Sequence, residues 1–264
     1  MIIKNQKELE VLREGGKRLA AILNEVARGA VAGISARELD ALAENLILKA
    51  GGAPSFKGYK ARGAQHSYPG ALCVSINEEV VHGLPTDRVL KTGDVVGLDI
   101  GMWWEGLCTD TALTVLVTQT KFRSFTDLNL VWVRASKLIE ATKKSLEIGI
   151  AEVRAGARIG NIGFAIQKYL EKEGFGVVRE LVGHGVGRAV HEDPEIPNWG
   201  KKGTGPELVE GMVIALEPMA TEGSPKVKIA PDGWTWFTKD GSRSAHFEHT
   251  LVVTKDGAEI LTQT

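Results

Sequence analysis

The sequence predicts a mixed α/β (α+β) domain in which two related halves each contribute two helices and a set of antiparallel strands. In each half, two segments carry apolar residues with a helical period. The segments 90–101 and 208–219 also share a pattern: Leu first, Gly fourth, an apolar run, then Leu and an acid at the ninth and tenth positions. A repeat of about 120 residues is too long for a solenoid and indicates a pseudo-two-fold domain. We therefore expect one domain over residues 1–264, with halves at approximately 1–120 and 121–264.

The composition is that of an ordinary globular protein. Of its 264 residues, 43% are hydrophobic and 25% charged, which is enough for a sizeable core. The net charge of −1 gives no signature of bulk nucleic-acid binding. Cys73 and Cys108 fit neither a disulfide framework nor a four-thiolate zinc site. Because the charged start lacks a signal-peptide core and no run approaches membrane-spanning length, we expect a cytoplasmic protein without a membrane partner.

The first half begins with two expected helices. The apolar positions of 7–29 predict the first. Ser35 and Glu38 form a capping-box pattern, so the second helix should run from Ser35 to about Ala50. The next segments are expected to be a loop, a short strand and a turn-rich connection, in that order: 55–70, 71–76 and 77–85.

Two β-rich runs, 95–100 and 109–117, are expected to form a hairpin. Each carries one aspartate that an apolar strand would not favour, Asp99 and Asp110. A hairpin centred on residues 104–105 sets the two aspartates directly opposite each other, with Cβ atoms roughly 4.5–5.5 Å apart. A buried carboxylate pair is costly unless something positive lies between them, which favours a metal. The alternative is two polar residues on a solvated strand face.

The second half repeats this order. Helices are expected from Leu128 to about Leu146 and from Ile159 to about Glu173, followed by a strand at 177–181. The segment 183–194, GHGVGRAVHEDP, is expected to be a loop, and the apolar run within 208–219 is expected to contain a strand that carries a carboxylate. Residues 226–238 are expected to form an inserted hairpin around a Pro-Asp-Gly turn.

Aligning the halves places Glu217 at the position of Asp99 and Glu248 at that of Asp110. Four acids in apolar strands are poorly explained by packing, because buried acids are normally paired or ligated. Four converging negative charges require more than one divalent ion. Oxygen-rich sites with an imidazole suit Mn, Fe, Co or Zn, and the sequence does not choose among them. Two ions roughly 3.5–4 Å apart would activate a bridging water and polarise a carbonyl.

Three of the six histidines lie in contexts suited to chemistry. His184 stands between two glycines, whose bare backbone allows close approach. His191 follows seven residues later, and His82 precedes a Gly-Leu-Pro turn. The other three are interpreted as ordinary surface or core residues: His66, His246 and His249.

Together these motifs resemble those of the type I methionine aminopeptidases of peptidase family M24, over essentially the whole chain. The matching segments are VHGLP, LDIG, TDT, GHGVG, HEDP, LEPM and FEHT, at 81–85, 98–101, 109–111, 183–187, 191–194, 216–219 and 247–250. The resemblance implies the pita-bread fold, with the site between two pseudo-symmetric halves. It also implies five ligands to two divalent metal ions: Asp99, Asp110, His184, Glu217 and Glu248. In the family pattern Asp110 and Glu248 bridge both ions, Asp99 completes one, and His184 with Glu217 complete the other.

The resemblance also suggests roles around the ions. Attack on a peptide carbonyl creates an oxyanion, which His191 is expected to stabilise. His82 would contact the substrate amide, and Glu217 is a candidate proton shuttle as well as a ligand. The methionine pocket would draw on four residues, although aromatic loop residues often serve as plain core: Tyr59, Tyr68, Cys73 and Trp234. Val81, Val190 and a longer stretch at 60–67 depart from the family pattern near this pocket and bear on its shape.

The implied activity is removal of the initiator methionine from nascent peptides whose second residue is small, by a monomer with the ribosome as a partner. Lys57, Lys60 and Arg62 are a candidate basic contact for the ribosome, or a solvated loop.

Two alternatives stay open. An X-Pro aminopeptidase or prolidase shares the fold but would carry an additional N-terminal domain. A non-catalytic pita-bread binding protein would have lost ligands, whereas all five ligand positions are filled here. The site residues, and not the fold, separate these alternatives.

Overall fold

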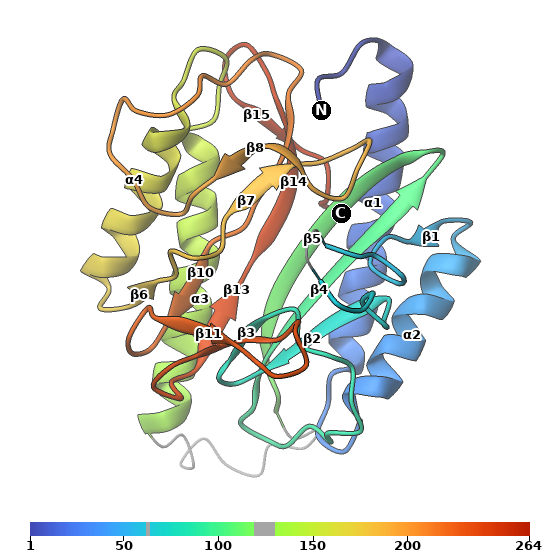
Figure 1. Cartoon of the computed structure of the whole chain (residues 1–264), viewed down its shortest axis with the longest axis vertical. Helices are drawn as coiled ribbons and strands as arrows, with labels where there is room; N and C mark the ends of the chain where they lie inside the picture. Colours follow the sequence, from blue (N-terminus) through green and yellow to red (C-terminus); the bar gives the residue numbers. More distant parts are fainter. Residues whose placement is uncertain (62–63, 119–129) are drawn as a thin grey trace.

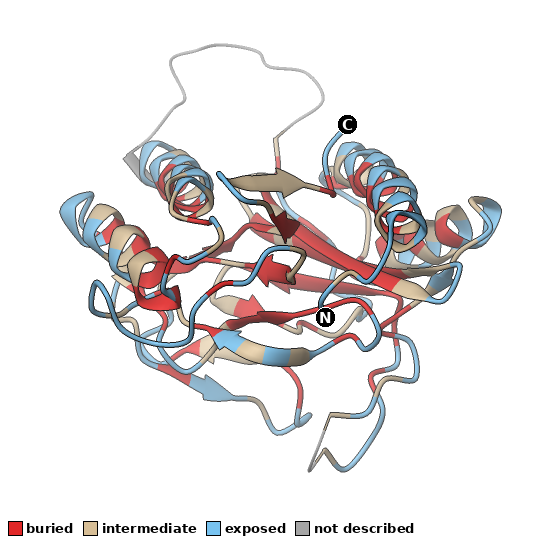
Figure 2. Ribbon diagram, turned by 90° about the horizontal axis from the view of Figure 1, so that it is seen from above, coloured by how far each residue is buried: buried red, intermediate tan, exposed pale blue. Residues whose placement is uncertain are grey.

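The structure is a computed structural model that describes residues 1–61, 64–118 and 130–264. One large curved sheet runs through the molecule, and two pairs of helices pack on one of its faces (Figure 1; Figure 2). Within the described ranges, no helix has the length and apolar character needed to cross a membrane. The expected mixed fold of helix pairs and antiparallel strands is confirmed.

The first helix pair matches the expectation closely. Helix α1 spans Gln6–Gly29 and α2 spans Ala36–Lys49. Ser35 accepts a hydrogen bond from the Glu38 amide, and the Glu38 carboxylate accepts one from the Ser35 amide, so the capping box is present. The buried stripes of both helices pack against β4 and form one apolar core with it.

The second pair consists of α3 (Leu130–Ala151) and α4 (Ile159–Lys172). The start expected at Leu128 lies outside the described residues. Helix α3 continues beyond the expected end at Leu146, although Gly149 is a poor helix former. A Cβ at Gly149 would lie only 2.8 Å from the Ile166 side chain of α4. Close packing of the two helices therefore explains both the glycine and the longer helix.

The large sheet has the order β1-β4-β5-β14-β9-β7-β8, with β2 also paired to β4 and β15 to β14, and all pairs are antiparallel. Its strands are β1 (Ala53–Pro54), β2 (Leu72–Ile76), β4 (Val95–Trp104), β5 (Leu107–Leu116), β7 (Gly183–Gly185), β8 (Glu192–Ile196), β9 (Val213–Leu216), β14 (Glu248–Val253) and β15 (Ala258–Ile260). The strand pairs β4–β5 and β9–β14 thus meet at the β5–β14 contact. This order is compatible with a two-fold relation between the halves, and the internal duplication itself stays a prediction.

Two small sheets complete the fold. One contains β13 (Ser244–His246), β10 (Met219–Thr221) and β6 (Gly176–Val177); the other contains β11 (Val227–Ile229), β12 (Trp236–Thr238) and β3 (Glu79–Val81). Strands β11 and β12 form the hairpin expected at 226–238. The prediction of a strand at 177–181 is wrong beyond Val177. Val177 pairs with Ala220, and the partner strand β10 has no residue before Met219 with which the chain could pair further. Arg179 and Glu180 are exposed.

The segment 183–194 is not the expected loop, because it contains β7 and the start of β8. Gly183 packs against the carbonyl oxygen of Ala215, and Gly185 against that of Asp193, so closely that neither position has room for a Cβ atom. Glycine has low β-propensity and marks a close backbone approach in a strand. The two glycines that allow these strands to pair therefore also give the segment the sequence pattern of a loop.

Strands β4 and β5 form the expected hairpin with a different register. Trp104 pairs with Leu107, which leaves a two-residue turn at Glu105 and Gly106 with φ values of 45° and 84°. Two positive φ values are typical of a type I′ hairpin turn. The prediction that Asp99 and Asp110 lie directly opposite each other is wrong, since Asp99 pairs with Ala112 and Asp110 with Gly101. The two aspartates are instead diagonal neighbours, which in sheets are roughly 7–8 Å apart.

Candidate active site

The pairing of β4, β5 and β14 gathers three carboxylates on one face of the sheet. Ala112 of β5 pairs with Asp99 on one side and with Glu248 on the other. Paired residues share a face, and residues two apart on a strand do so as well. Asp110, two residues before Ala112, therefore points to the same side as Asp99 and Glu248.

The strands on the other side of β14 add two more groups. Ala215 of β9 pairs with Thr250, two residues after Glu248, and also with His184 of β7. By the same alternation His184 faces the same side as Glu248, and so does Glu217, which follows the end of β9. The four acids and the histidine thus converge although they are far apart in the chain.

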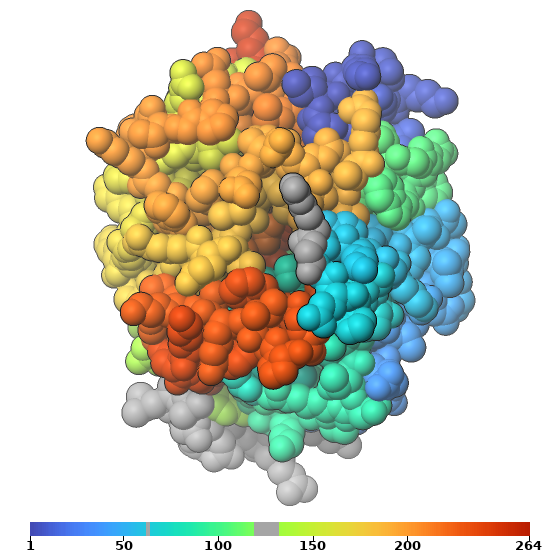
Figure 3. Space-filling model, in the orientation of Figure 1, coloured from blue at the N-terminus to red at the C-terminus, as the bar shows by residue number. Residues whose placement is uncertain are grey.

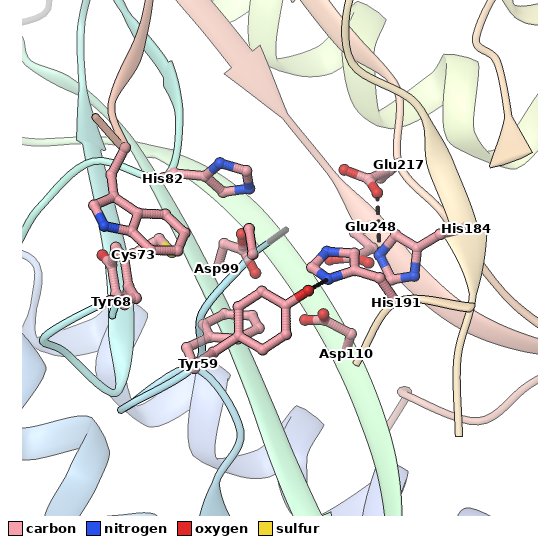
Figure 4. A pocket seen from close by; sticks show the side chains of 13 residues that line it. Tyr59, Tyr68, Cys73, His82, Asp99, Asp110, His184, His191, Glu217 and Glu248 are labelled. Atoms are coloured by element: carbon pink, nitrogen blue, oxygen red, sulfur yellow. Dashed lines mark hydrogen bonds and ion pairs between the residues drawn. The ribbon is translucent and has the colours of Figure 1, made fainter. Parts of the chain in front are cut away.

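These groups line a single pocket that opens on the sheet face opposite the helices. Figure 3 shows the surface hollowed between the cyan segment before β2 and the orange segment that includes β11 and β12. Every residue assigned to the site from sequence lines this pocket, as do Phe56 and Ala61 (Figure 4): Tyr59, Tyr68, Cys73, His82, Asp99, Asp110, His184, His191, Glu217, Trp234 and Glu248. Phe56 and Ala61 were not singled out, because nothing in an irregular loop indicates which side chains turn inward.

The buried acids lack the partners that would hold them ionised. Oδ1 of Asp99, Oδ1 of Asp110 and Oε1 of Glu248 make no hydrogen bond within the described ranges. Burial raises the pKa of Asp99 to about 7, and burial together with the neighbouring acids raises the pKa of Asp110 and Glu248 well above its usual range. Once these acids are ionised, acceptor atoms that face one another without donors are stabilised by a cation between them. Ligand atoms of Asp110, His184 and Glu248 all lie within 4.8 Å of one another, as a shared ion requires.

His184 is oriented as a metal ligand. Its Nδ1 lies 2.9 Å from the carbonyl oxygen of Gly185, which can only accept, so we assign the ring hydrogen to Nδ1. Burial lowers the pKa of His184 to about 3 and keeps the ring neutral. Its Nε2 therefore offers a lone pair, and it lies 3.4 Å from Oε1 of Glu217, whose pKa burial raises to about 8. When Glu217 is ionised, two electron pairs face each other there, which also fits a cation.

His191 and His82 flank the carboxylates from two loops. His191 lies at the exposed rim, its ring centroid 4.4 Å from that of His184 and its Nδ1 2.8 Å from the Tyr59 hydroxyl. Burial, with the nearby histidines His191 and His246, lowers the pKa of His82 to about 4. His82 also has a φ of 56°, a strained backbone for a non-glycine residue and one that clusters at functional sites.

The remaining lining residues form an aromatic wall. The Tyr68 hydroxyl donates to the carbonyl oxygens of Gly83 and Leu72, at 2.8 and 3.2 Å, which fixes its ring. Trp234 packs edge-on against Tyr68, with ring centroids 5.3 Å apart. Cys73 pairs with Asp99 across β2 and β4, so the wall adjoins the acids.

Of the departures from the family pattern, Val81 and Val190 are buried and do not line the pocket. Arg62 and Gly63, in the stretch 60–67, lie outside the described residues.

The histidines interpreted as ordinary differ in their surroundings. His66 is exposed, and His249 contacts Thr262 through its Nδ1 without lining the pocket. His246 is buried, and its Nε2 lies 3.4 Å from Oε2 of Glu217. Sequence reasoning missed this contact. A signal was present in the position of His246 two residues before Glu248, but a core histidine gives the same pattern.

The fold and this cluster define a metal-dependent hydrolase with carboxylate and imidazole ligands. The sequence model of metallopeptidase family M24 matches residues 10–255 of this chain. Methionine aminopeptidase 1 of Bacillus subtilis is 45% identical over 263 residues, which cover 100% of this chain and 99% of that protein. The crystal structure of methionine aminopeptidase from Thermotoga maritima superposes with a TM-score of 0.90 at 44% identity and 100% coverage of both chains. The chain belongs to metallopeptidase family M24 and, within it, to the methionine aminopeptidases.

A more distant likeness concerns the fold alone. The crystal structure of X-Pro aminopeptidase from Thermotoga maritima has a TM-score of 0.70 at 21% identity, and this chain covers 63% of it. The pita-bread fold expected from the sequence is confirmed by these likenesses. The identity over the full chain, and not the fold, separates the methionine aminopeptidases from the X-Pro enzymes.

Proposed function

We propose that this protein is a methionine aminopeptidase, a metal-dependent hydrolase that removes the initiator methionine from nascent proteins. The observation that carries this conclusion is a set of buried carboxylates beside His184, three of which have an oxygen without a hydrogen bond among the described residues, in a chain similar over its whole length to methionine aminopeptidases. The substrate class is nascent peptides with an N-terminal methionine and a small second residue.

Two divalent ions, drawn from Co, Mn, Fe and Zn, would be held by five side chains: Asp99, Asp110, His184, Glu217 and Glu248. Asp110 and Glu248 stand on adjacent strands at the centre of the sheet and would be the central ligands of this set, as the family pattern implies. The ions supply an activated water nucleophile and polarise the scissile carbonyl. The unpartnered acceptor oxygens support this ligand set.

Three residues of the chain act on the substrate and its protons. Tyr59 contacts Nδ1 of His191 and so leaves the other ring nitrogen for the oxyanion that forms on the substrate. The neutral ring of His82 contacts the substrate amide. The Glu217 carboxylate lies beside the other proposed ligands and is placed to accept and pass a proton during the reaction.

The aromatic wall would receive the methionine side chain. Tyr68, Trp234 and Phe56 offer apolar surface, and Cys73 and Tyr59 complete the lining. Methionine is unbranched and its thioether makes favourable contacts with aromatic rings. This composition supports a preference for methionine over branched or charged first residues.

We further propose that the protein acts in the cytoplasm, where nascent chains are available, and as a monomer, because all the site residues come from one chain. The ribosome remains a proposed partner. Of the candidate basic contacts, Lys57 pairs with Glu44 at 2.6 Å, Lys60 is exposed, and Arg62 lies outside the described residues.

The deciding experiment is hydrolysis of Met-Gly-Met-Met beside an Ala-Pro and a Leu-Gly peptide. The protein is treated with EDTA and reconstituted with Mn, Co, Fe or Zn. Metal-dependent release of methionine alone is the expected result. Cleavage of the X-Pro peptide would favour a prolidase-like enzyme, and metal binding without any cleavage would favour a non-catalytic binding protein.

A further inference from the structure

His246 is a buried side chain at the metal site that the proposed chemistry leaves without a task. It is the last residue of β13 and is 2% exposed. Its Nε2 makes no hydrogen bond within the described part of the chain, yet lies 3.4 Å from Oε2 of Glu217. A buried imidazole nitrogen without a partner is costly, so its orientation calls for an explanation.

The backbone around His246 is fixed by strands that carry the ligands. The Thr114 side chain, on the strand of Asp110, accepts a hydrogen bond from the His246 amide at 2.9 Å and donates one to its carbonyl oxygen at 2.7 Å. His246 also pairs with Met219, two residues after Glu217. These contacts hold the backbone of His246 in register with β5 and β10, so the position from which its ring extends toward Glu217 is fixed.

Glu217 lies between two imidazoles, one on each carboxylate oxygen. Oε1 is 3.4 Å from Nε2 of His184, and Oε2 is 3.4 Å from Nε2 of His246. The ring hydrogen of His184 is assigned to Nδ1, so Oε1 of ionised Glu217 faces the lone pair of Nε2. These two atoms are therefore suited to bind an ion between them. The Glu217 side chain is only 12% exposed, so a donor to Oε2 stabilises it, and the Nε2–H of a neutral His246 is the group placed to supply one.

We propose that His246 is a positioning residue that donates from Nε2 to Oε2 of Glu217 and so turns Oε1 toward His184 and the ion these two residues hold. The inference rests on the proposed metal site. Partners of this kind orient metal ligands, and their loss costs affinity although they never touch the ion. His246 acts through Glu217 and does not line the substrate pocket.

The test measures metal binding directly. The full chain, stripped with EDTA, is titrated with Mn²⁺ by calorimetry in three variants. His246→Gln retains an N–H donor, His246→Leu removes it at similar volume, and His249→Leu is the control, a neighbouring histidine that contacts Thr262 and not the pocket. Thermal unfolding checks that each variant folds. If His246→Leu does not fold, His246→Asn, whose shorter amide does not reach Oε2, replaces it.

We expect His246→Leu to weaken one Mn²⁺ site by about 10–100-fold, while His246→Gln and His249→Leu bind like the parent protein. With Met-Gly-Met-Met as substrate, kcat should fall in His246→Leu with KM unchanged, since the aromatic wall is intact. The inference is overturned if His246→Leu binds both ions as tightly as the parent, or if His246→Gln loses as much affinity as His246→Leu. A parent protein that binds Mn²⁺ but cleaves no methionyl peptide would instead count against the proposed function alone.

Discussion

At Glu248, we expect the exchange of a single ligand atom to abolish most of the activity. It is 2% exposed, and its Oε1 has no hydrogen-bond partner in the described ranges. The substitution Glu248→Gln keeps the shape but replaces one ligand oxygen by an amide nitrogen whose hydrogens cannot ligate. We expect activity to fall by more than roughly 100-fold, beyond the loss typical of outer partners, with the fold retained. Peptide hydrolysis, bound-metal analysis and circular dichroism check this.

The exposed Glu195 on the neighbouring edge strand provides the control, since Glu195→Gln should leave both metal content and turnover unchanged. Near-full turnover of Glu248→Gln with added metal would show that Glu248 does not bridge the ions.

Substitution of His191 should lower the rate of catalysis without loss of bound metal. It lies at the exposed rim with its Nδ1 on the Tyr59 hydroxyl. The change His191→Ala removes one contact to the developing oxyanion, so we expect kcat to fall by ~10²–10³ while both ions stay bound. Tyr59→Phe should have a smaller effect of the same kind, because it frees the ring without deleting it. Metal analysis beside steady-state kinetics tests this, and loss of metal in His191→Ala would make His191 a ligand instead.

Among single residues, the sequence predicted which side chains come together in the pocket, but not the contacts that surround them. Asp99 and Glu248 stand out because an acid in an apolar strand is costly without a partner. His246 does not stand out, because a histidine in a β-rich segment is compatible with an ordinary core. Its role depends on the 3.4 Å approach to Glu217, which strand pairing creates and local sequence does not encode.

Among the elements, the β4–β5 hairpin shows how a turn determines the geometry of a site. The expected centre at residues 104–105 would have opposed Asp99 and Asp110 directly. The turn lies one residue later because Gly106 readily takes a positive φ, and Trp104 remains in the strand. Pattern and residue type predicted both strands, but the register depended on backbone conformation at one glycine.

Glu105 allows this turn to be tested. A non-glycine residue at a φ of 45° is strained, and Asn tolerates this region better than Glu, whereas Val tolerates it worst. We expect Glu105→Asn to stabilise the protein and Glu105→Val to destabilise it, each by about 1 kcal/mol. Urea unfolding in EDTA, with an unchanged slope, measures the shift in midpoint.

Because Glu105 is exposed and does not line the pocket, kcat should be the same in both variants. Equal stability of the Asn and Val variants would contradict a strained turn at this position.

For the whole molecule, the repeat predicted which acids belong together, but not how they meet. The contact of β5 with β14 brings Asp110 of one half to Glu248 of the other. That contact joins strands more than a hundred residues apart, and no local pattern specifies such a pairing. The family resemblance implied a site between the two halves, and the sheet order shows how Asp110 and Glu248 come together.

Concentrating acids in this way should make stability depend on pH and metal together. The ordinary pKa values are 3.8 for Asp99 and 4.5 for Glu217, and burial raises them to about 7 and about 8. Above about pH 6.5 histidines such as His82 and His184 lose their remaining protons in the unfolded chain, while these carboxyls hold protons only when folded. The folded state then binds more protons than the unfolded state, so stability falls as the pH rises.

We therefore expect the Tm of the EDTA-treated protein to fall between about pH 6.5 and pH 8, the window set by Asp99 and Glu217. Divalent ions bind deprotonated carboxylates, so the rise in Tm on adding Mn²⁺ should be larger at the upper end of this window. Thermal unfolding at both pH values, with EDTA or excess Mn²⁺, measures this. Glu217→Gln, which cannot ionise, should flatten the fall in EDTA. A Tm that rises with pH in EDTA would mean that burial does not hold these acids protonated. A Mn²⁺-induced rise in Tm of equal size at both pH values would mean that the metal does not relieve repulsion among ionised carboxylates.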